Sequence, residues 1–314
     1  MAEVIKPTPK KGKDFSQHLQ DIKEASAKKE SLWRERVEIS VDTKGFPYFL
    51  LHPLSDLHLG HVGVDLDALA SHLDFIDNTP VHTIWVGDLG DFFLPKAIPS
   101  GMLGDVATPS EQLEALTQLM QSYADKTLAV VNDPSHPGWV NKTTGLDVYE
   151  LATRGLDIPL LNTGGIIELN INGIIYKLAV FHKIHSYNSS LNRLNAHHRI
   201  RELHTDVDVV IAGHRHIGAM EKSVHREGKP TFLQMGTFKI NDQYGVREGM
   251  IPRPQVFFPT LFFDARRKNV EMIEDLGTAQ EMIQALSLAY KQEGVGLLGV
   301  AKQDEKKRRT STKR

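Results

Sequence analysis

The sequence contains no cysteine. This absence excludes disulfide bonds, iron–sulfur clusters and thiolate zinc sites, so any metal must be held by imidazole, carboxylate, amide or water ligands. Long apolar runs are also missing, since none approaches the roughly 20 residues of a membrane span. The first residues carry charges where a signal peptide would have its apolar core. We therefore expect a cytoplasmic protein with no membrane partner.

The sequence also has no large excess of positive or negative charge, since its formal net charge is −2. The balance hides an asymmetry, since the last residues, AKQDEKKRRTSTKR, are strongly basic. Such a tail is typical either of a disordered, solubilising end or of a segment that contacts nucleic acid, and composition leaves both open. The sequence gives no indication of the oligomeric state.

The 314 residues suffice for one large domain with short additions at each end. Segment 1–36 is predicted to be a basic N-terminal segment and a surface helix from about Phe15 to Arg36. Segment 37–280 is predicted to form the main domain. Segment 281–314 is expected to be a C-terminal helix followed by the basic, disordered tail.

Within the main domain, apolar strands first alternate with amphipathic helices and later follow one another. The predicted helices are 65–78, 110–125 and 192–203. The predicted strands are 37–41, 48–56, 82–88, 127–131, 166–173, 174–182, 207–216, 230–238, 256–265 and 267–276, with a hairpin turn at Asn172-Gly173. This order predicts an α/β fold, with two packed, mostly mixed β-sheets flanked by helices.

Residue types that bind metals recur at the ends of the apolar strands. Because the sites of α/β enzymes form at strand ends, the recurrence predicts a metal site. The i, i+2 spacing also predicts that Asp56 and His58 leave their strand on the same side. The candidates are Asp56, His58, Asp88, Asp91, Asn132, Asp133, Ser135, His136, His182, His185, His214 and His216.

Four short sequence blocks contain most of these candidates, and their order and spacing together are more specific for a protein family than any single block. The blocks are Asp56-Leu57-His58, Gly87-Asp88-Leu89-Gly90-Asp91, His182 and Gly213-His214-Arg215-His216. The pattern resembles the calcineurin-like metallophosphoesterase superfamily over about residues 45–265. The region from QMGTFKINDQYG onward is also similar to phage and bacterial members of the DNA repair exonuclease type.

The resemblance implies a dinuclear metal centre. Its ligands would be Asp56, His58 and His216 for one ion and Asn132, His182 and His214 for the other, with Asp88 bridging both. Imidazole, carboxylate and amide ligands suit Mn, Fe, Zn or Ni, and we expect Mn. The implied activity is hydrolysis of a phosphodiester or phosphomonoester by a hydroxide that the two metals activate, with DNA as one candidate substrate.

The sequence departs from the family's G-N-H-D/E block, for which the corresponding text is VVNDPSHPGW. In one register Asn132 is a metal ligand and Asp133 takes the histidine position. In the other, Ser135 replaces the asparagine and His136 is the general acid. Our preferred interpretation combines Asn132 on the metal with His136 at the phosphate, where Asp91 would orient the histidine. If the loop fails to complete the site, the chain is a catalytically impaired, metallophosphoesterase-like binding protein.

Overall fold

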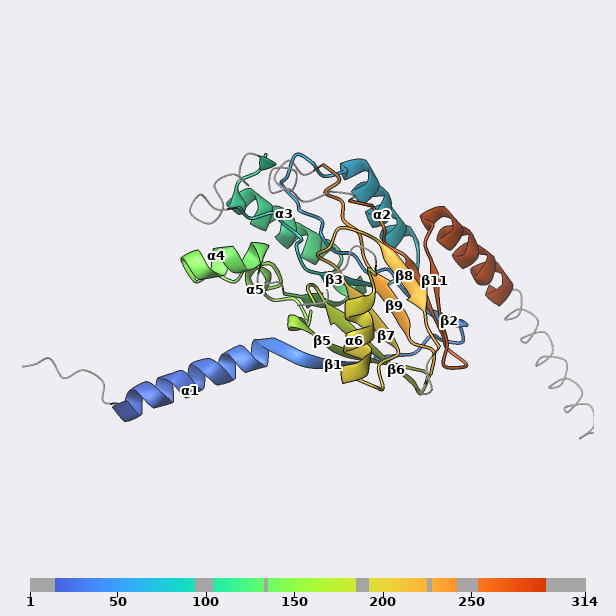
Figure 1. The fold of residues 1–314 in the computed structure, drawn as a ribbon, viewed down its shortest axis with the longest axis horizontal. Helices are drawn as coiled ribbons and strands as arrows, with labels where there is room; N and C mark the ends of the chain where they lie inside the picture. The colour runs from blue at the N-terminus through green and yellow to red at the C-terminus, as the bar shows by residue number, and fades with distance from the viewer. Residues whose placement is uncertain are drawn as a thin grey trace, which may run out of the picture.

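The structure is a computed structural model, and it describes residues 15–93, 104–132, 135–184, 192–224, 228–241 and 254–291. Two β-sheets lie at its centre, with helices around them (Figure 1). The larger sheet has the strand order β3-β4-β5-β6-β7-β9-β8, and β1 also pairs with β5. Its strands are β1 (Trp33–Val41), β3 (Thr83–Val86), β4 (Thr127–Val131), β5 (Leu160–Ile171), β6 (Ile174–Phe181), β7 (Val209–Ala212), β8 (Ala219–Lys222) and β9 (Thr231–Gln234).

The start of β5 brings two distant strand ends together. Strand β4 runs parallel to β5, and its last residue, Val131, pairs with Leu161. Strand β6 runs antiparallel to β5, and its last residue, Phe181, pairs with Gly164. The residues that follow β4 and β6 therefore leave the sheet at neighbouring places, although the two strands approach from opposite directions.

The smaller sheet is antiparallel, with the order β11-β10-β2. Its strands are β2 (Tyr48–Leu51), β10 (Thr260–Asp264) and β11 (Val270–Ile273). Beyond β2 the chain continues alongside β3, with parallel bridges that pair Leu54 with Trp85 and Leu59 with Gly90. This continuation links the two sheets and carries the Asp56–His58 segment to the end of β3.

The larger sheet is buried on both faces around β6, β7 and β9. Leu178, Val180 and Ile211 point into the core that is shared with the smaller sheet. Their neighbours Ala179, Val210 and Phe232 point the other way, into a second cluster beneath α6 (Asn195–Leu203). Because successive strand residues face opposite sides, strands buried on both faces have the near-continuous apolar runs seen in this sequence.

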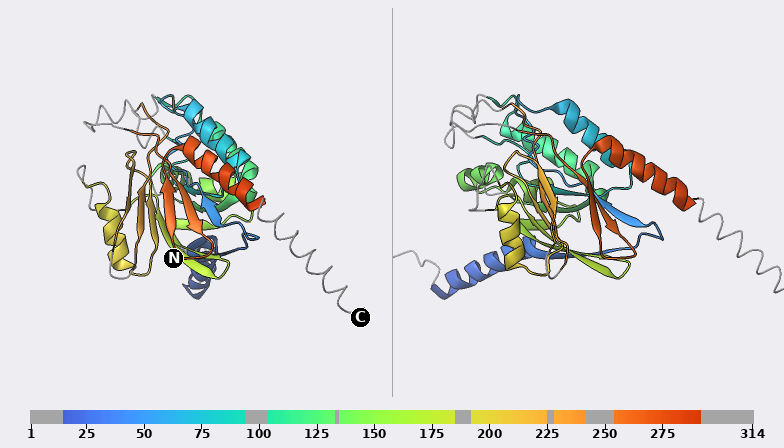
Figure 2. Two further views of the ribbon diagram at one scale, coloured as in Figure 1. Left: turned by 90° about the vertical axis from the view of Figure 1, so that its right-hand side faces the viewer. Right: turned by 45° about the vertical axis from the view of Figure 1, so that its right-hand side comes forward.

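The remaining helices lie around the sheets, with the exception of the first. They are α2 (Leu66–Asn78), α3 (Pro109–Ser122), α4 (His136–Thr144), α5 (Val148–Ala152) and the helical segment 276–291. Helix α1 (Phe15–Leu32) instead projects away from the body, as Figure 1 and the right-hand view of Figure 2 show. Helix α3 begins with a capping box between Thr108 and Glu111. Among the described residues, no helix has both the length and the apolar character to cross a membrane.

The predicted fold class is confirmed, and so is the hairpin turn at Asn172-Gly173, where both residues have left-handed φ angles of 51° and 93°. Several boundaries were wrong. The first helix ends at Leu32 rather than Arg36, because Trp33 and Arg34 already pair with β5. Helices α4 and α5 and strand β8 were not predicted, since each is short and has a weak periodic pattern.

Candidate metal centre

Two sequence blocks lie side by side at the centre of the site. The main-chain amide of Asp56 donates to the carbonyl of Gly87 at 3.1 Å, and that of His58 donates to the carbonyl of Asp88 at 3.0 Å. The predicted reason for the direction of Asp56 and His58 was wrong, because β2 already ends at Leu51. Backbone pairing with the chain beyond β3, rather than the pleat of a strand, places these side chains.

The backbone is strained at the candidate ligands. A left-handed φ is unfavourable for residues other than glycine, by roughly 1–2 kcal/mol each. Such conformations persist where the surrounding structure fixes them, and they cluster at functional sites. Five of the candidates have φ angles in this region: Asp56 (53°), His58 (49°), Asp88 (48°), His214 (72°) and His216 (56°).

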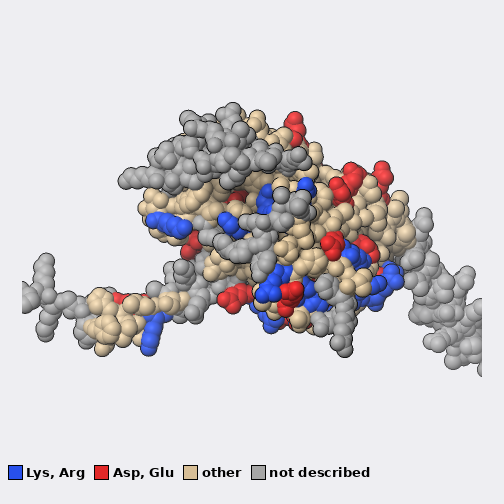
Figure 3. All heavy atoms as spheres, in the orientation of Figure 1, with Lys and Arg blue, Asp and Glu red and all other residues tan. Residues whose placement is uncertain are grey.

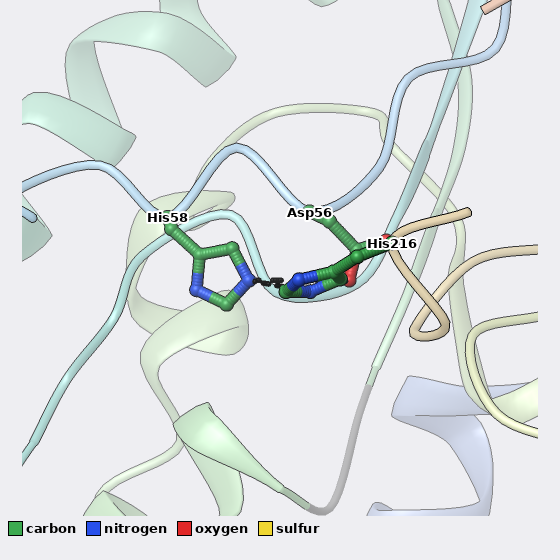
Figure 4. A group of neighbouring side chains, drawn as sticks. All are labelled: Asp56, His58 and His216. Carbon is green, nitrogen blue, oxygen red and sulfur yellow. Dashed lines mark hydrogen bonds and ion pairs between the residues drawn. The ribbon is translucent and has the colours of Figure 1, made fainter. Parts of the chain in front are cut away.

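Asp56, His58 and His216 form the first donor set, in which each contributes an atom within 4.8 Å of the others. Figure 4 shows the His58 ring turned toward His216, with the Asp56 carboxylate beside it. The two Nε2 atoms are 3.1 Å apart, and Nε2 of His216 lies 3.1 Å from Oδ1 of Asp56. These three side chains come from segments about 160 residues apart in the sequence, and the fold directs them to one point.

Asp88, His182 and His214 form the second donor set. Nε2 of His182 lies 3.2 Å from Nδ1 of His214 and 3.2 Å from Oδ2 of Asp88. Nδ1 of His182 faces the carbonyl of Val86 at 2.7 Å. Because a carbonyl only accepts, Nδ1 must carry the ring proton, and Nε2 presents a lone pair to the other donors.

The first set has the same arrangement of protons. Nδ1 of His58 lies 2.5 Å from a carboxylate oxygen of Asp91, so that nitrogen carries the proton and Nε2 has a lone pair. Oδ1 of Asp56 is buried and accepts no well-aligned hydrogen bond from the described residues. An N–H of His216 can point at either Nε2 of His58 or Oδ1 of Asp56 but not at both. A divalent cation can bind to both atoms at once. The donor set therefore fits a metal ion.

Burial keeps the histidines in the form that binds metals. It lowers the pKa of His58 to about 4, against the opposing effect of Asp91. Burial together with His182 lowers the pKa of His214 to about 3. For Asp56, burial alone would raise the pKa, but His182 and His216 outweigh it and lower the pKa to about 2. Near neutral pH, His58 and His214 are thus neutral imidazoles and Asp56 is an ionised carboxylate.

His136 lies beside the bridging candidate. It is the first residue of α4, and its Nε2 is 3.7 Å from Oδ2 of Asp88. Ser135 donates to the other oxygen of Asp88 at 3.2 Å. The rings of Phe93 and Trp139 contact the His136 ring, with centroids 5.1 and 4.6 Å away. The ring is therefore held in place, while 13% of the side chain stays exposed.

The predicted contact of Asp91 needs a correction. Nδ1 of His136 lies 2.5 Å from the main-chain carbonyl of Asp91 and 3.6 Å from its carboxylate. The carboxylate instead accepts hydrogen bonds from His58 and from the ammonium of Lys239. Its position between these two donors, rather than its spacing in the motif, decides which histidine it orients.

Some of the predicted site residues are not members of the two donor sets. Asn132 directly follows β4, and its main-chain amide donates to Leu161 at 2.8 Å, so its role as a ligand stays a prediction. Asp133 and His185 lie outside the described residues. Sequence reasoning missed Lys239, which lies within the run FLQMGTFKI and has no visible partner in the sequence. A lysine in a mostly apolar run is the signal that could have indicated a buried charge.

Comparison with known proteins gives remote structural similarity. No family model and no curated protein matches the chain. Among solved structures, Vacuolar Protein Sorting 29 from Cryptosporidium parvum has 12% identity and a TM-score of 0.41, over 73% of this chain and 98% of that one. A predicted phosphoesterase from Streptococcus pneumoniae has 14% identity and a TM-score of 0.36, over 72% and 90%. A metallophosphoesterase from Sphaerobacter thermophilus has 14% and 0.35, over 76% and 95%.

Proposed function

We propose that this chain is a dinuclear metal-dependent phosphoesterase of the calcineurin-like kind. The observation that carries the proposal is the closeness of the two donor sets. Oδ1 of Asp56, in the first set, lies 3.9 Å from Nε2 of His182, in the second. Asp88 belongs to the second set, and its carboxylate also lies within 4.8 Å of ring nitrogens of His58 and His136. When bound, two divalent ions would activate a water molecule and neutralise the charge of a phosphate ester.

His136 has the position required of a general acid. Its Nδ1 donates to the main-chain carbonyl of Asp91, so Nε2 is the atom that takes up or releases a proton. That atom faces Asp88, and the ring remains partly open to solvent. A group at this place can protonate a departing alkoxide, which typically contributes a factor of about 10² to 10⁴ in rate.

Small phosphodiesters and phosphomonoesters are the substrates to test first. On the face shown in Figure 3, Lys and Arg side chains are mixed with Asp and Glu side chains in the described regions. Several cations of the described residues are paired, such as Lys222 with Glu271 at 2.9 Å and Lys268 with Asp208 at 2.9 Å. Paired cations are poor partners for a phosphate backbone, whose binding depends on free positive charge. The basic tail lies outside the described residues.

A binding protein without turnover is the second candidate, and the departure from the G-N-H-D/E block favours it. Asn132 and His136 are separated by three residues, and the histidine begins a helix. If the amide oxygen of Asn132 does not reach the second donor set, that set has one carboxylate and two imidazoles. The two candidates differ in metal content and in turnover.

The test is metal content together with hydrolysis. Protein loaded with Mn²⁺ would be desalted and its metal measured by mass spectrometry, and turnover of a bis-aryl phosphate diester would be followed. We expect near two ions per chain and hydrolysis, with Zn²⁺, Fe²⁺ and Ni²⁺ compared in parallel. Ion binding without turnover of any phosphoester would favour the binding protein. No ion bound would refute the metal centre.

The variant Asp88→Asn should abolish hydrolysis, because an amide cannot bridge two cations as a carboxylate does. The matched control is Asp264→Asn. Asp264 is also a buried carboxylate, but its side chain pairs with Arg266 and Arg267, and neither of these belongs to a donor set. The control should keep full metal content and turnover. Equal loss in both variants would mean that the effect comes from destabilisation rather than from the site.

A further inference from the structure

Lys239 is a buried lysine whose ammonium pairs with the carboxylate of Asp91. Only 2% of the residue is exposed. Its Nζ lies 3.2 Å from Oδ1 and 3.3 Å from Oδ2 of Asp91, and 5.4 Å from the ring centroid of Phe93. Lysine is almost never fully buried without a partner, because its charge must leave water. The ion pair with Asp91 therefore offsets part of the free-energy cost of burying the ammonium of Lys239.

The partner of Asp91 on the other side is a candidate metal ligand. Oδ1 of Asp91 lies 2.5 Å from Nδ1 of His58, and Nε2 of the same ring faces His216 at 3.1 Å. A continuous chain of contacts thus leads from Lys239 through Asp91 and His58 to the first donor set. Ring orientation and tautomer of a ligating histidine are commonly set by the group that its second nitrogen contacts.

The charges of the groups decide the direction of these hydrogen bonds, because an ionised carboxylate has acceptors only. An ammonium has three donors and no acceptor, so the Asp91 oxygens beside Lys239 must accept. The same carboxylate then also accepts from His58, which places the ring proton on Nδ1 and the lone pair on Nε2. A side chain that donated to Nδ1 would reverse this and direct an N–H at the metal position.

The backbone of Lys239 is fixed to the site as well. Its amide donates to the hydroxyl of Thr237 at 2.9 Å, and that hydroxyl donates to the carbonyl of Asp56 at 2.9 Å. Lys239 also forms a β-bridge with Val64. The main chain of Lys239 is therefore held against the segment that carries Asp56, a ligand of the first donor set, and this fixes where its side chain starts toward Asp91.

We propose that Lys239 is a positioning residue for the metal centre. By holding Asp91 as an acceptor, it sets the tautomer and orientation of His58 and so presents the lone pair of Nε2 to the ion. The consequence for metal affinity rests on the proposed function. The tautomer of His58 does not, because it is a property of the metal-free protein.

The experiment combines nitrogen-15 NMR of the histidine rings in metal-free protein with calorimetric titration of Mn²⁺. The wild type should show His58 with its proton on Nδ1. In Lys239→Met this signal should shift toward the other tautomer or a mixture of the two, and Mn²⁺ should bind about 10 to 100-fold more weakly. Lys239→Arg keeps a donor-only cation and should restore much of both. His58→Gln identifies the resonance.

The matched control is Lys126→Met. Lys126 is a half-buried lysine whose Nζ donates to main-chain carbonyls such as that of Thr79, at 3.0 Å, and none of its hydrogen-bond partners among the described residues is a candidate ligand. It should lower the melting temperature and leave both the His58 signal and Mn²⁺ affinity unchanged. A general loss of stability is thereby separated from a change at His58.

Should Lys239→Met fail to fold, Asp91→Asn tests the same idea. Lys239 would take the amide oxygen, which leaves the NH₂ group facing His58, and the ring proton should move to Nε2. An unchanged His58 tautomer in the folded variants overturns the proposal. If the wild type binds no Mn²⁺, the proposed function fails, and the tautomer result alone supports or overturns the role of Lys239.

Discussion

The main-chain amide of His214 donates a hydrogen bond of 2.9 Å to Oδ2 of Asp56, across 158 positions in the sequence. Ser55 donates to the same oxygen. The other oxygen, Oδ1, faces His216 at 3.1 Å and accepts no well-aligned hydrogen bond from the described residues. The two oxygens of Asp56 thus have different roles. Oδ2 holds the loop of His214 and His216 in place, and Oδ1 faces the candidate metal position.

This division predicts different results for two substitutions of Asp56. Asparagine keeps an oxygen for the His214 amide and directs its NH₂ group at the histidine lone pairs, where it cannot bind a cation. Asp56→Asn should therefore fold normally, while its Mn²⁺ content falls from near two ions per chain to one or none. Asp56→Ala also loses the loop anchor and should be about 1–3 kcal/mol less stable. Urea denaturation and metal analysis measure both effects. Full metal content in Asp56→Asn would contradict the ligand assignment.

The role of His136 predicts a dependence on the leaving group. His136→Ala should lower kcat about 10² to 10⁴-fold on an alkyl phosphate ester, whose leaving alkoxide needs a proton. On an aryl ester with a good leaving group, the loss should be within about tenfold, because that group departs without protonation. Steady-state kinetics on the two substrates test this. Equal losses on both would show that His136 acts otherwise, for example by holding Asp88 in place.

Gly87 and Gly145 form a matched pair for testing the packing behind the site. Both have a left-handed φ, of 77° and 76°. A Cβ at Gly145 would meet nothing within 4 Å, whereas a Cβ at Gly87 would lie 2.3 Å from Nδ1 of His182. Gly145→Ala should destabilise by about 1 kcal/mol through the backbone alone. Gly87→Ala should add about 1–3 kcal/mol from the clash.

Metal binding should separate the two glycine variants further. Displacement of His182 in Gly87→Ala should weaken the second donor set, so this variant should bind less Mn²⁺ than the wild type. Gly145→Ala should bind the same amount. Equal stability and equal metal content in the two variants would show that the position of His182 does not depend on Gly87.

A buried histidine pair away from the metal centre predicts acid sensitivity. Nε2 of His52 lies 2.8 Å from Nδ1 of His72, and Nδ1 of His52 contacts Thr260 at 2.9 Å. Burial lowers the pKa of His72 to about 4, and burial with the nearby His72 holds the pKa of His52 well below its usual range. Below about pH 6.5 the unfolded chain binds protons that the folded chain does not, so stability falls with pH down to about pH 4.

The variant His72→Gln isolates this contribution. Glutamine can hydrogen-bond to His52 but does not titrate, so the slope of stability against pH between about 6 and 4.5 should fall by up to about 1.4 kcal/mol per unit. Urea denaturation at several pH values in the presence of a chelator measures the slope without metal effects. A slope equal to that of the wild type would mean that His72 takes up its proton in the folded state as easily as in the unfolded one.

Local sequence determined the pieces of the fold and the residue types of the site. Apolar runs such as HTIWV and TLAVV become strands because their side chains are buried on both faces. Asn172-Gly173 makes its turn because both residues tolerate a left-handed φ. Asp56, His58, Asp88, His182, His214 and His216 were all identified from the sequence, since metal-binding residue types recur after these strands.

Only the tertiary structure decided how these residues meet. The directions of Asp56 and His58 come from pairing with the chain beyond β3. The Asp91 carboxylate accepts hydrogen bonds from His58 and from Lys239, 148 positions away, whereas His136 lies 3.6 Å from it. Sequence periodicity reports which face of an element is buried, but it carries no information about which distant groups share that interior. Contacts across long separations depend on the packing of whole elements, and they set the tautomers and charges on which the chemistry depends.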